Sequence, residues 1–125
     1  MQFLKSQRVQ RLAFILFWLA MVFAVVMAML PKPPQMPSDQ FGDKVNHILA
    51  FAALSALAAV GFPQVPRWRV VERLSFLGAL IEVFQSIPAL HRDCDVKDWI
   101  ADTLAILVVA GLAALVLGKQ ENVTR

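Results

Sequence analysis

The stretch that decides the fold is GALIEVFQSIPALHRDCDVKDWIAD, residues 78–102. It contains two apolar runs, and each run includes an acidic residue, Glu82 in the first and Asp102 in the second. A proline and a group of charged residues separate the two runs. Ionisable side chains are costly at membrane depth, so those that persist there indicate a functional site. We therefore interpret this stretch as a hairpin between two membrane helices, with a polar site near its turn.

Composition places the chain among integral membrane proteins. Its 125 residues suffice for one domain, and a hydrophobic content of 58% with a mean hydropathy of +0.62 is too apolar for a soluble domain of that size. The net charge of +3 does not indicate nucleic acid, because the twelve Lys and Arg are spread between apolar runs. A single cysteine, Cys94, excludes an intrachain disulfide and a cysteine-based metal motif.

Four apolar segments are long enough to cross a bilayer, whose hydrocarbon core of about 30 Å needs roughly 20 helical residues. Proline-rich or charged stretches separate them, at 31–42 (PKPPQMPSDQFG) and 63–73 (PQVPRWRVVER) as well as in the hairpin. We predict an all-α integral membrane protein with one domain, residues 1–125, and four transmembrane helices at about 12–30, 44–62, 72–90 and 98–118.

Two further features qualify these helices. The basic residues ahead of the first segment also suit a signal peptide, but the apolar run is longer than a usual signal and no small-residue cleavage site follows, so we predict an uncleaved helix. The second segment has seven small residues between Ala50 and Ala59, and the third contains Gly78. Small residues let helices approach closely, which predicts that helices two and four pack against helix three.

The distribution of Lys and Arg predicts the orientation. Eight lie on the side of the two chain ends: Lys5, Arg8, Arg11, Arg67, Arg69, Arg73, Lys119 and Arg125. Four lie on the other side: Lys32, Lys44, Arg92 and Lys97. The positive-inside rule then predicts cytoplasmic termini, with the loops at 31–44 and 91–98 outside. The expected location is the inner (cell) membrane, in contact with membrane lipids and with oligomerisation left open.

Polar residues of three predicted helices meet at the outer end. They form pairs at helical spacing, and each pair shares a helix face: Asp43 with His47, Glu82 with Gln85, and Asp98 with Asp102. If helix three ends near Leu90, Glu82 lies about 12 Å inside the boundary, whereas His47 and Asp102 are about one turn deep. This predicts a shallow polar cavity with Glu82 at its floor.

Each of these residues also has a structural interpretation. Glu82 could pair with Arg92 or Lys44 and serve only to fix the order of the helices. His47, alone on an apolar face, could be a hydrogen-bonded packing residue. Asp43 and Asp98 could be N-caps that interact with the helix dipole. The sequence alone leaves these alternatives open.

The spacing of these residues resembles a known family. Asp43-Lys44-x-x-His47 opens one helix, Glu82-x-x-Gln85 closes another, and Arg92 and Asp98 follow. Over about residues 42–117 this pattern resembles the VanZ-like membrane protein family, which is named for a protein associated with low-level teicoplanin resistance. The resemblance implies seven ligand-binding residues: Asp43, Lys44, His47, Glu82, Gln85, Arg92 and Asp98. The family usually has Asn where this chain has Asp102 and Gly where it has Ala105, so the resemblance assigns no role to Asp102.

Two functions follow from these residues. In the first, the outward-facing cavity binds an amphiphilic or lipid-linked envelope ligand, such as an envelope precursor or a lipoglycopeptide antibiotic, and by the resemblance contributes to glycopeptide resistance. In the second, the chain is a small membrane enzyme acting on a lipid-linked substrate, with His47 and Glu82 as acid and base or as metal ligands.

We prefer the binding protein, with no catalytic residue, metal or cofactor assigned. His47 is the one histidine within a predicted helix, and the sequence lacks the HExxH-type spacing of zinc hydrolases. A transporter is disfavoured because its essential charges would lie near the midplane, whereas these lie at one end.

Overall fold

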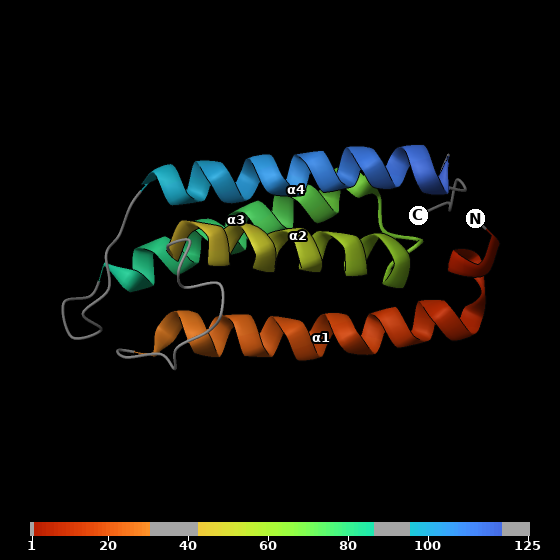
Figure 1. Cartoon of the computed structure of the whole chain (residues 1–125), viewed down its shortest axis with the longest axis horizontal. Helices are drawn as coiled ribbons and strands as arrows, with labels where there is room; N and C mark the ends of the chain where they lie inside the picture. The colour runs from red at the N-terminus through yellow and green to blue at the C-terminus, as the bar shows by residue number, and fades with distance from the viewer. Residues whose placement is uncertain (1, 31–42, 87–95, 119–125) are drawn as a thin grey trace.

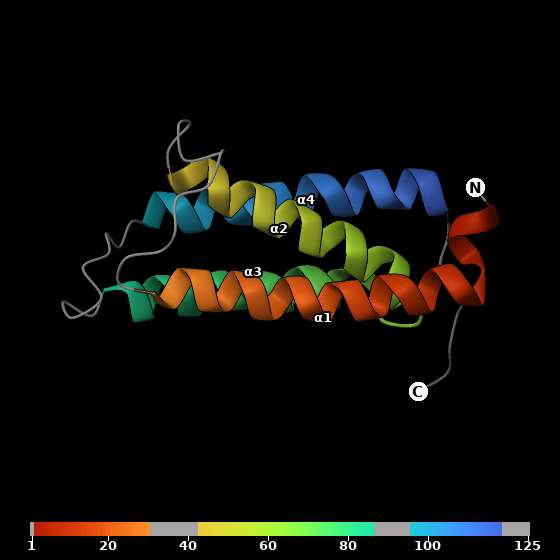
Figure 2. The ribbon, with the colours of Figure 1, turned by 60° about the horizontal axis from the view of Figure 1, so that its bottom comes forward.

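The computed structural model describes residues 2–30, 43–86 and 96–118. Within these ranges a short 3-10 helix, η1 (Gln2–Lys5), is followed by four α-helices: α1 (Gln7–Met29), α2 (Asp43–Gly61), α3 (Arg67–Gln85) and α4 (Val96–Leu117). The four helices run along the long axis of the molecule, and α1 begins at the same end at which α4 finishes (Figures 1 and 2). The predicted all-α fold with four helices is confirmed for the described residues.

Local sequence signals fix the ends of α1. The Ser6 side chain accepts a hydrogen bond from the Val9 amide and caps the helix, so a polar turn precedes the apolar run predicted from residue 12. Leu30 leaves the helix with an extended backbone, ψ 133°. Pro31 follows it in the sequence, and a residue before proline disfavours the α conformation.

Helix α3 differs from the helix predicted at 72–90, and its bounds are corrected to Arg67–Gln85. It begins directly after Pro66, whose φ of −57° already suits a helix start. The apolar run at 74–90 led the prediction to include residues beyond Pro88, although proline disfavours helix at the residue before it. Glu82 therefore lies in the last turn of α3 instead of deep inside a longer helix.

Helix α2 is central to the packing. It lies mainly against α1 and α4, whereas α3 lies mainly against α4 and touches α2 less. The predicted contact of helices three and four is confirmed, but the chief partners of α2 are α1 and α4. Leu54 of α2 and Ile106 of α4 are almost fully buried in the core. Gly78 is also buried, in agreement with its predicted interface position.

Helices α1 and α2 approach closely at Gly61. A Cβ atom at this position would lie 2.7 Å from the Phe14 nitrogen and 2.9 Å from its Cα, so only glycine fits without a backbone shift. Phe62 follows and packs against α1, with its ring centroid 5.1 Å from that of Phe14 in a tilted arrangement and 5.1 Å from that of Phe17 in an edge-to-face arrangement. Small and aromatic residues thus fix this end of the bundle.

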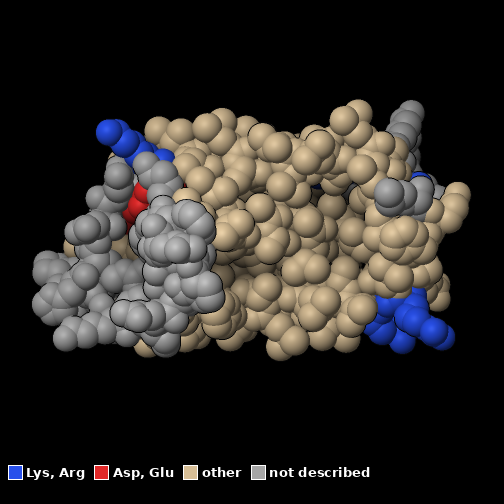
Figure 3. Space-filling view, in the orientation of Figure 1, with Lys and Arg blue, Asp and Glu red and all other residues tan. Residues whose placement is uncertain are grey.

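Two helices, α1 and α4, are long and apolar enough to cross a membrane. Only 17% of the apolar window in α1 and 11% of that in α4 are buried, whereas a core helix of a soluble protein would be mostly buried. On the face shown in Figure 3, the middle of the molecule carries no Lys, Arg, Asp or Glu, and the charged side chains lie towards the two ends. Helix α3 does not meet the same criterion, because several charged residues interrupt it.

Candidate functional site

Three buried ionisable side chains meet between α2, α3 and α4. His47 comes from the beginning of α2, Glu82 from the end of α3 and Asp102 from the second turn of α4. Their exposed fractions are 8%, 5% and 0%. We refer to His47, Glu82 and Asp102 as the acid–imidazole cluster.

Distances within the acid–imidazole cluster are short. The Nδ1 atom of His47 lies 3.5 Å from Oδ2 of Asp102 and 3.9 Å from Oε1 of Glu82. One nitrogen or oxygen atom from each of the three residues lies within 4.8 Å of the other two. Each helix contributes one group, so the cluster depends on the packing of all three.

Asp102 is the least satisfied member of the cluster. Both of its carboxylate oxygens are buried, and neither accepts a hydrogen bond from the residues that the structure describes. The contact with His47 at 3.5 Å is longer than a good hydrogen bond. A buried polar group without hydrogen bonds is rare and costly, and such a group in a folded protein calls for an ion, a ligand or a proton to compensate it.

Measured from the ends of the described helices, Glu82 is not the deepest of the three side chains, which differs from the predicted cavity with Glu82 at its floor. Glu82 is three residues before the last residue of α3, His47 four after the first of α2, and Asp102 six after the first of α4. At about 1.5 Å per residue these are depths of roughly 4.5, 6 and 9 Å. Asp102 is therefore farther from its helix end than Glu82.

The remaining predicted site residues are placed as follows. Gln85 is buried, and its Nε2 donates a hydrogen bond of 3.0 Å to the Ala28 carbonyl, which joins α3 to the last turn of α1. Asp98 is buried in the first turn of α4, where the helix dipole favours an acid. Asp43 begins α2.

Some of the predicted residues cannot be placed in the site. The side chains of Asp43 and Lys44, and the whole of Arg92, lie outside the part that the structure describes. The predicted pair between Glu82 and Arg92 therefore stays a prediction. The two loops at 31–42 and 87–95, which we predict to face outward, also lie outside the described residues.

Asp102 belongs to the cluster, although it is not among the seven ligand-binding residues that the family resemblance implies. The structure places it together with His47 and Glu82. The signal that identifies it is present in the sequence: an acid one turn after Asp98, on the same helix face, within an otherwise apolar run. Burial of both aspartates confirms that they share a face that points into the bundle.

A second polar contact between α3 and α4 lies next to the cluster. The hydroxyls of Ser75 and Thr103 are 2.9 Å apart and share a hydrogen bond, and the Trp99 indole donates to the Ser75 carbonyl at 3.0 Å. We refer to these three residues as the hydroxyl–indole contact. Gly78 separates the two regions: a Cβ atom there would lie 3.5 Å from Cδ1 of Trp99 and 3.6 Å from Oδ2 of Asp102.

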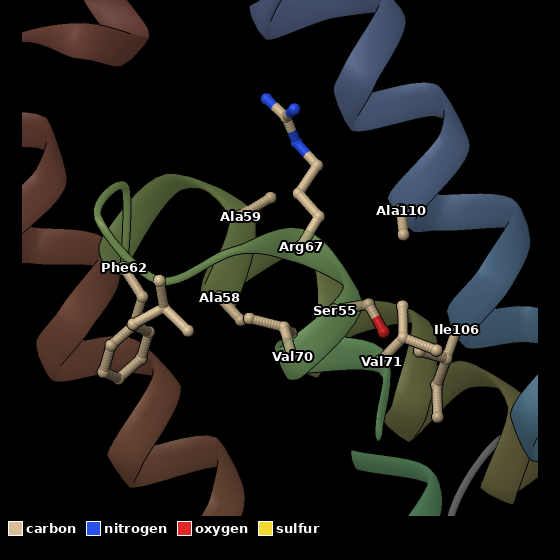
Figure 4. A pocket seen from close by; sticks show the side chains of 10 residues that line it. Ser55, Ala58, Ala59, Phe62, Arg67, Val70, Val71, Ile106 and Ala110 are labelled. Atoms are coloured by element: carbon tan, nitrogen blue, oxygen red, sulfur yellow. The ribbon is translucent and has the colours of Figure 1, made fainter. Parts of the chain in front are cut away.

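A pocket lies towards the other end of the bundle, between α2, α3 and α4. Small and aliphatic side chains form most of its lining, among them Ala58, Val70 and Ile106 (Figure 4). The Arg67 side chain extends away from this lining, and its Nη2 donates a hydrogen bond of 2.8 Å to the Gly118 carbonyl just after α4. Arg67 thus compensates the C-terminal carbonyls of α4. The lining offers no acid or imidazole, so the acid–imidazole cluster is the better candidate for chemistry.

Comparison with other proteins does not extend these observations. Protein-family models, curated proteins and solved structures all give no match to this chain. The resemblance to the VanZ-like family therefore stays a prediction that rests on the residues quoted above.

Proposed function

We propose that the chain is a multi-pass protein of the inner membrane, with four spans and both termini in the cytoplasm. Support comes from the two exposed apolar helices α1 and α4 and from the eight-to-four distribution of Lys and Arg in the sequence. The loops that follow α1 and α3 are then outside, together with the ends of the helices that carry the acid–imidazole cluster.

Reporter fusions test this topology. Alkaline phosphatase, which is active only outside the cytoplasm, is fused after Pro37, within 92–97, after Arg67 or at the C-terminus. The first two fusions should be active and the last two inactive. A cytoplasmic reporter at the same positions should give the opposite pattern, and a reversed result would place the cluster on the inner side.

We propose further that the outer end binds an amphiphilic envelope ligand through its polar head, in the manner expected of a VanZ-like protein. The observation that carries this proposal is the buried Asp102 carboxylate, which receives no hydrogen bond from the described residues. The cluster holds two carboxylates against one imidazole, so it favours a cationic group on the ligand. The exposed apolar faces of α1 and α4 suit an acyl chain beside the head.

A binding experiment tests this ligand class. The full chain in nanodiscs of neutral lipid is titrated with the amine-bearing lipoglycopeptide teicoplanin and with a glycopeptide that lacks the acyl chain. Asp102→Asn should weaken teicoplanin binding at least about tenfold, because a hydrogen bond to a charged group contributes about 1.5–3 kcal/mol.

Glu72→Gln is the matched control, since Glu72 is an exposed acid on α3. It should leave the affinity unchanged. Equal binding by wild type and Asp102→Asn, or equal binding with and without the acyl chain, would contradict the proposal. A strain without the native copy, complemented with each variant, should show teicoplanin sensitivity in the same order.

A second candidate is a membrane enzyme that acts on a lipid-linked substrate. It is favoured by the proximity of the His47 imidazole to two carboxylates, since an acid can orient and charge-balance a catalytic histidine. Turnover of a polyprenyl diphosphate by the purified chain, lost in His47→Gln and retained in Glu72→Gln, would select this alternative. Absence of turnover with retained teicoplanin binding would select the binding protein.

A further inference from the structure

We propose that His47, Glu82 and Asp102 bind a divalent metal ion, with Zn²⁺ as the best fit. A metal ion at this site would compete with the cationic group of the proposed amphiphile for the same two carboxylates, and metal content is measured without any organic ligand. Donor type, spacing, charge and the unsatisfied carboxylate support the metal site.

The donor types suit Zn²⁺. An imidazole nitrogen and two carboxylate oxygens are available, one from each helix. Imidazole is a common ligand of Zn²⁺, whereas Ca²⁺ and Mg²⁺ use oxygen ligands in larger number. Zinc sites with three protein ligands keep a fourth position for water or substrate.

The spacing is close to that of a metal centre. A tetrahedral ion with bonds of about 2.0–2.1 Å holds its ligand atoms roughly 3.3–3.4 Å apart. In the structure His47 Nδ1 is 3.5 Å from Asp102 Oδ2 and 3.9 Å from Glu82 Oε1. The Glu82 and Asp102 oxygens lie within 4.8 Å of each other. Side-chain adjustments of up to about 1.5 Å therefore bring the three donors to the spacing of a tetrahedral ion.

Charge gives a second, independent reason. A neutral imidazole with two carboxylates carries two negative charges, which one divalent ion cancels. Burial makes an uncompensated charge costly, and Asp102 is fully buried with neither oxygen hydrogen bonded to the described residues. The absence of a Cβ at Gly78 leaves a methyl-sized space beside this carboxylate, because an added Cβ would be in van der Waals contact with Oδ2 at 3.6 Å. A bound metal ion therefore compensates the Asp102 carboxylate, which receives no hydrogen bond from the described residues.

The experiment uses the full chain, purified in detergent with its affinity tag removed and its metal stripped by a chelator. Zn²⁺ is titrated in competition with a chromophoric chelator, and Mn²⁺ and Mg²⁺ are tested in the same way. Wild type should bind one Zn²⁺ per chain and prefer it to Mg²⁺. Asp102→Asn and Glu82→Gln should each weaken binding more than about 100-fold, because loss of a group that only supports a metal ligand already costs 10–100-fold.

Glu72→Gln is again the matched control, with the same residue type and the same substitution on the same helix as Glu82→Gln. It should bind Zn²⁺ as wild type does. The metal site is overturned if wild type takes up no stoichiometric ion, or if Asp102→Asn folds and binds Zn²⁺ with unchanged affinity.

A spectroscopic measurement on wild type covers the case in which the cluster variants do not fold. X-ray absorption of the Zn²⁺-loaded chain should show nitrogen and oxygen neighbours near 2.0–2.1 Å with one imidazole. A sulfur neighbour near 2.3 Å would place the ion at Cys94 and overturn the proposal. Failure of teicoplanin binding with retained Zn²⁺ binding would remove the proposed ligand and leave the metal site intact.

Discussion

Helices α3 and α4 hold polar groups in two neighbouring regions, the hydroxyl–indole contact and the acid–imidazole cluster. In the first, the Ser75 and Thr103 hydroxyls bond to each other and the Trp99 indole bonds to a carbonyl. In the second, the Asp102 carboxylate is fully buried, whereas the first region is partly buried, and it receives no hydrogen bond from the described residues. Both regions lie between α3 and α4, and the cluster also receives His47 from α2.

The difference lies in what each region needs for its stability. In the hydroxyl–indole contact, the donors form their hydrogen bonds with other protein atoms. Such neutral hydrogen bonds between helices in an apolar environment stabilise helix packing. The acid–imidazole cluster needs a bound ion or ligand to compensate its carboxylates, since an isolated buried charge is costly. The acid–imidazole cluster is more deeply buried than the hydroxyl–indole contact and less well hydrogen bonded, and these two properties together distinguish the candidate site from the structural region.

The largest expected effect comes from a change that breaks both regions at once. Gly78→Leu places side-chain atoms between Trp99 and Asp102, where even a Cβ is already in contact. We expect a loss of about 1–3 kcal/mol in the free energy of unfolding, measured by chemical denaturation in detergent. Gly78→Ala is the control and should be tolerated, because its Cβ contacts are no shorter than 3.4 Å. A leucine variant as stable as wild type would mean that Gly78 faces lipid.

A change within the cluster alone should have the opposite sign. In the presence of chelator, Asp102→Asn removes a buried charge and should stabilise the chain by about 1–2 kcal/mol. Added Zn²⁺ should stabilise wild type by about 2.7 kcal/mol at 100 times its dissociation constant and leave the variant unchanged. Melting curves with and without the ion measure both effects. A destabilised Asp102→Asn in chelator would show that the carboxylate is satisfied by the chain.

A change within the hydroxyl–indole contact should destabilise by a smaller amount, with or without metal. Thr103→Val keeps the shape of the side chain and removes the hydroxyl that bonds to Ser75. The expected cost is about 1 kcal/mol, the usual net value of one hydrogen bond. Zn²⁺ affinity should stay at the wild-type value, since this contact contributes no ligand. A shift of affinity would show that the two regions are not independent.

The smallest effect is expected at a buried hydroxyl that belongs to neither region. Ser55 donates to the Phe51 carbonyl within α2, at 2.7 Å. That carbonyl also accepts the regular helical hydrogen bond, so Ser55→Ala leaves nothing unsatisfied. We expect a change within about 0.5 kcal/mol by thermal melting. A larger loss would mean that Ser55 has a partner in another helix.

The sequence predicted the helices better than their contacts. Apolar runs separated by proline and charge identified all four, and helical spacing identified the faces that carry His47 and Glu82. The depth of Glu82 was wrong because it depended on where α3 ends, and an apolar run does not show where its helix stops. Asp102 is missing from the predicted ligand-binding residues because these followed the family pattern, which has no acid at that position, and not the helical spacing of Asp102 from Asp98.

Other features depend on three-dimensional packing and have no counterpart in a single sequence. The contact of Gly61 with the α1 backbone joins residues about 47 positions apart, and glycine near a helix end is ordinarily a sign of helix termination. The bond from Gln85 to Ala28 likewise depends on which helices are neighbours. Helix periodicity gives the face on which a side chain lies, but not the helix that this face meets.

Helix α3 has a consequence for how the chain enters the membrane during synthesis. Four charged residues, Arg67, Arg69, Glu72 and Arg73, lie in its first two turns and Glu82 lies in its last, so α3 is less apolar than α1 and α4 and does not meet the criterion for a membrane span that they meet. On the proposed topology, α3 leaves the ribosome before α4, which supplies the hydroxyl–indole contact and Asp102. Stable insertion of α3 therefore has to wait for α4, and a nascent chain that stops at Ser86 should leave α3 exposed to extraction by alkaline carbonate while α1 stays in the bilayer.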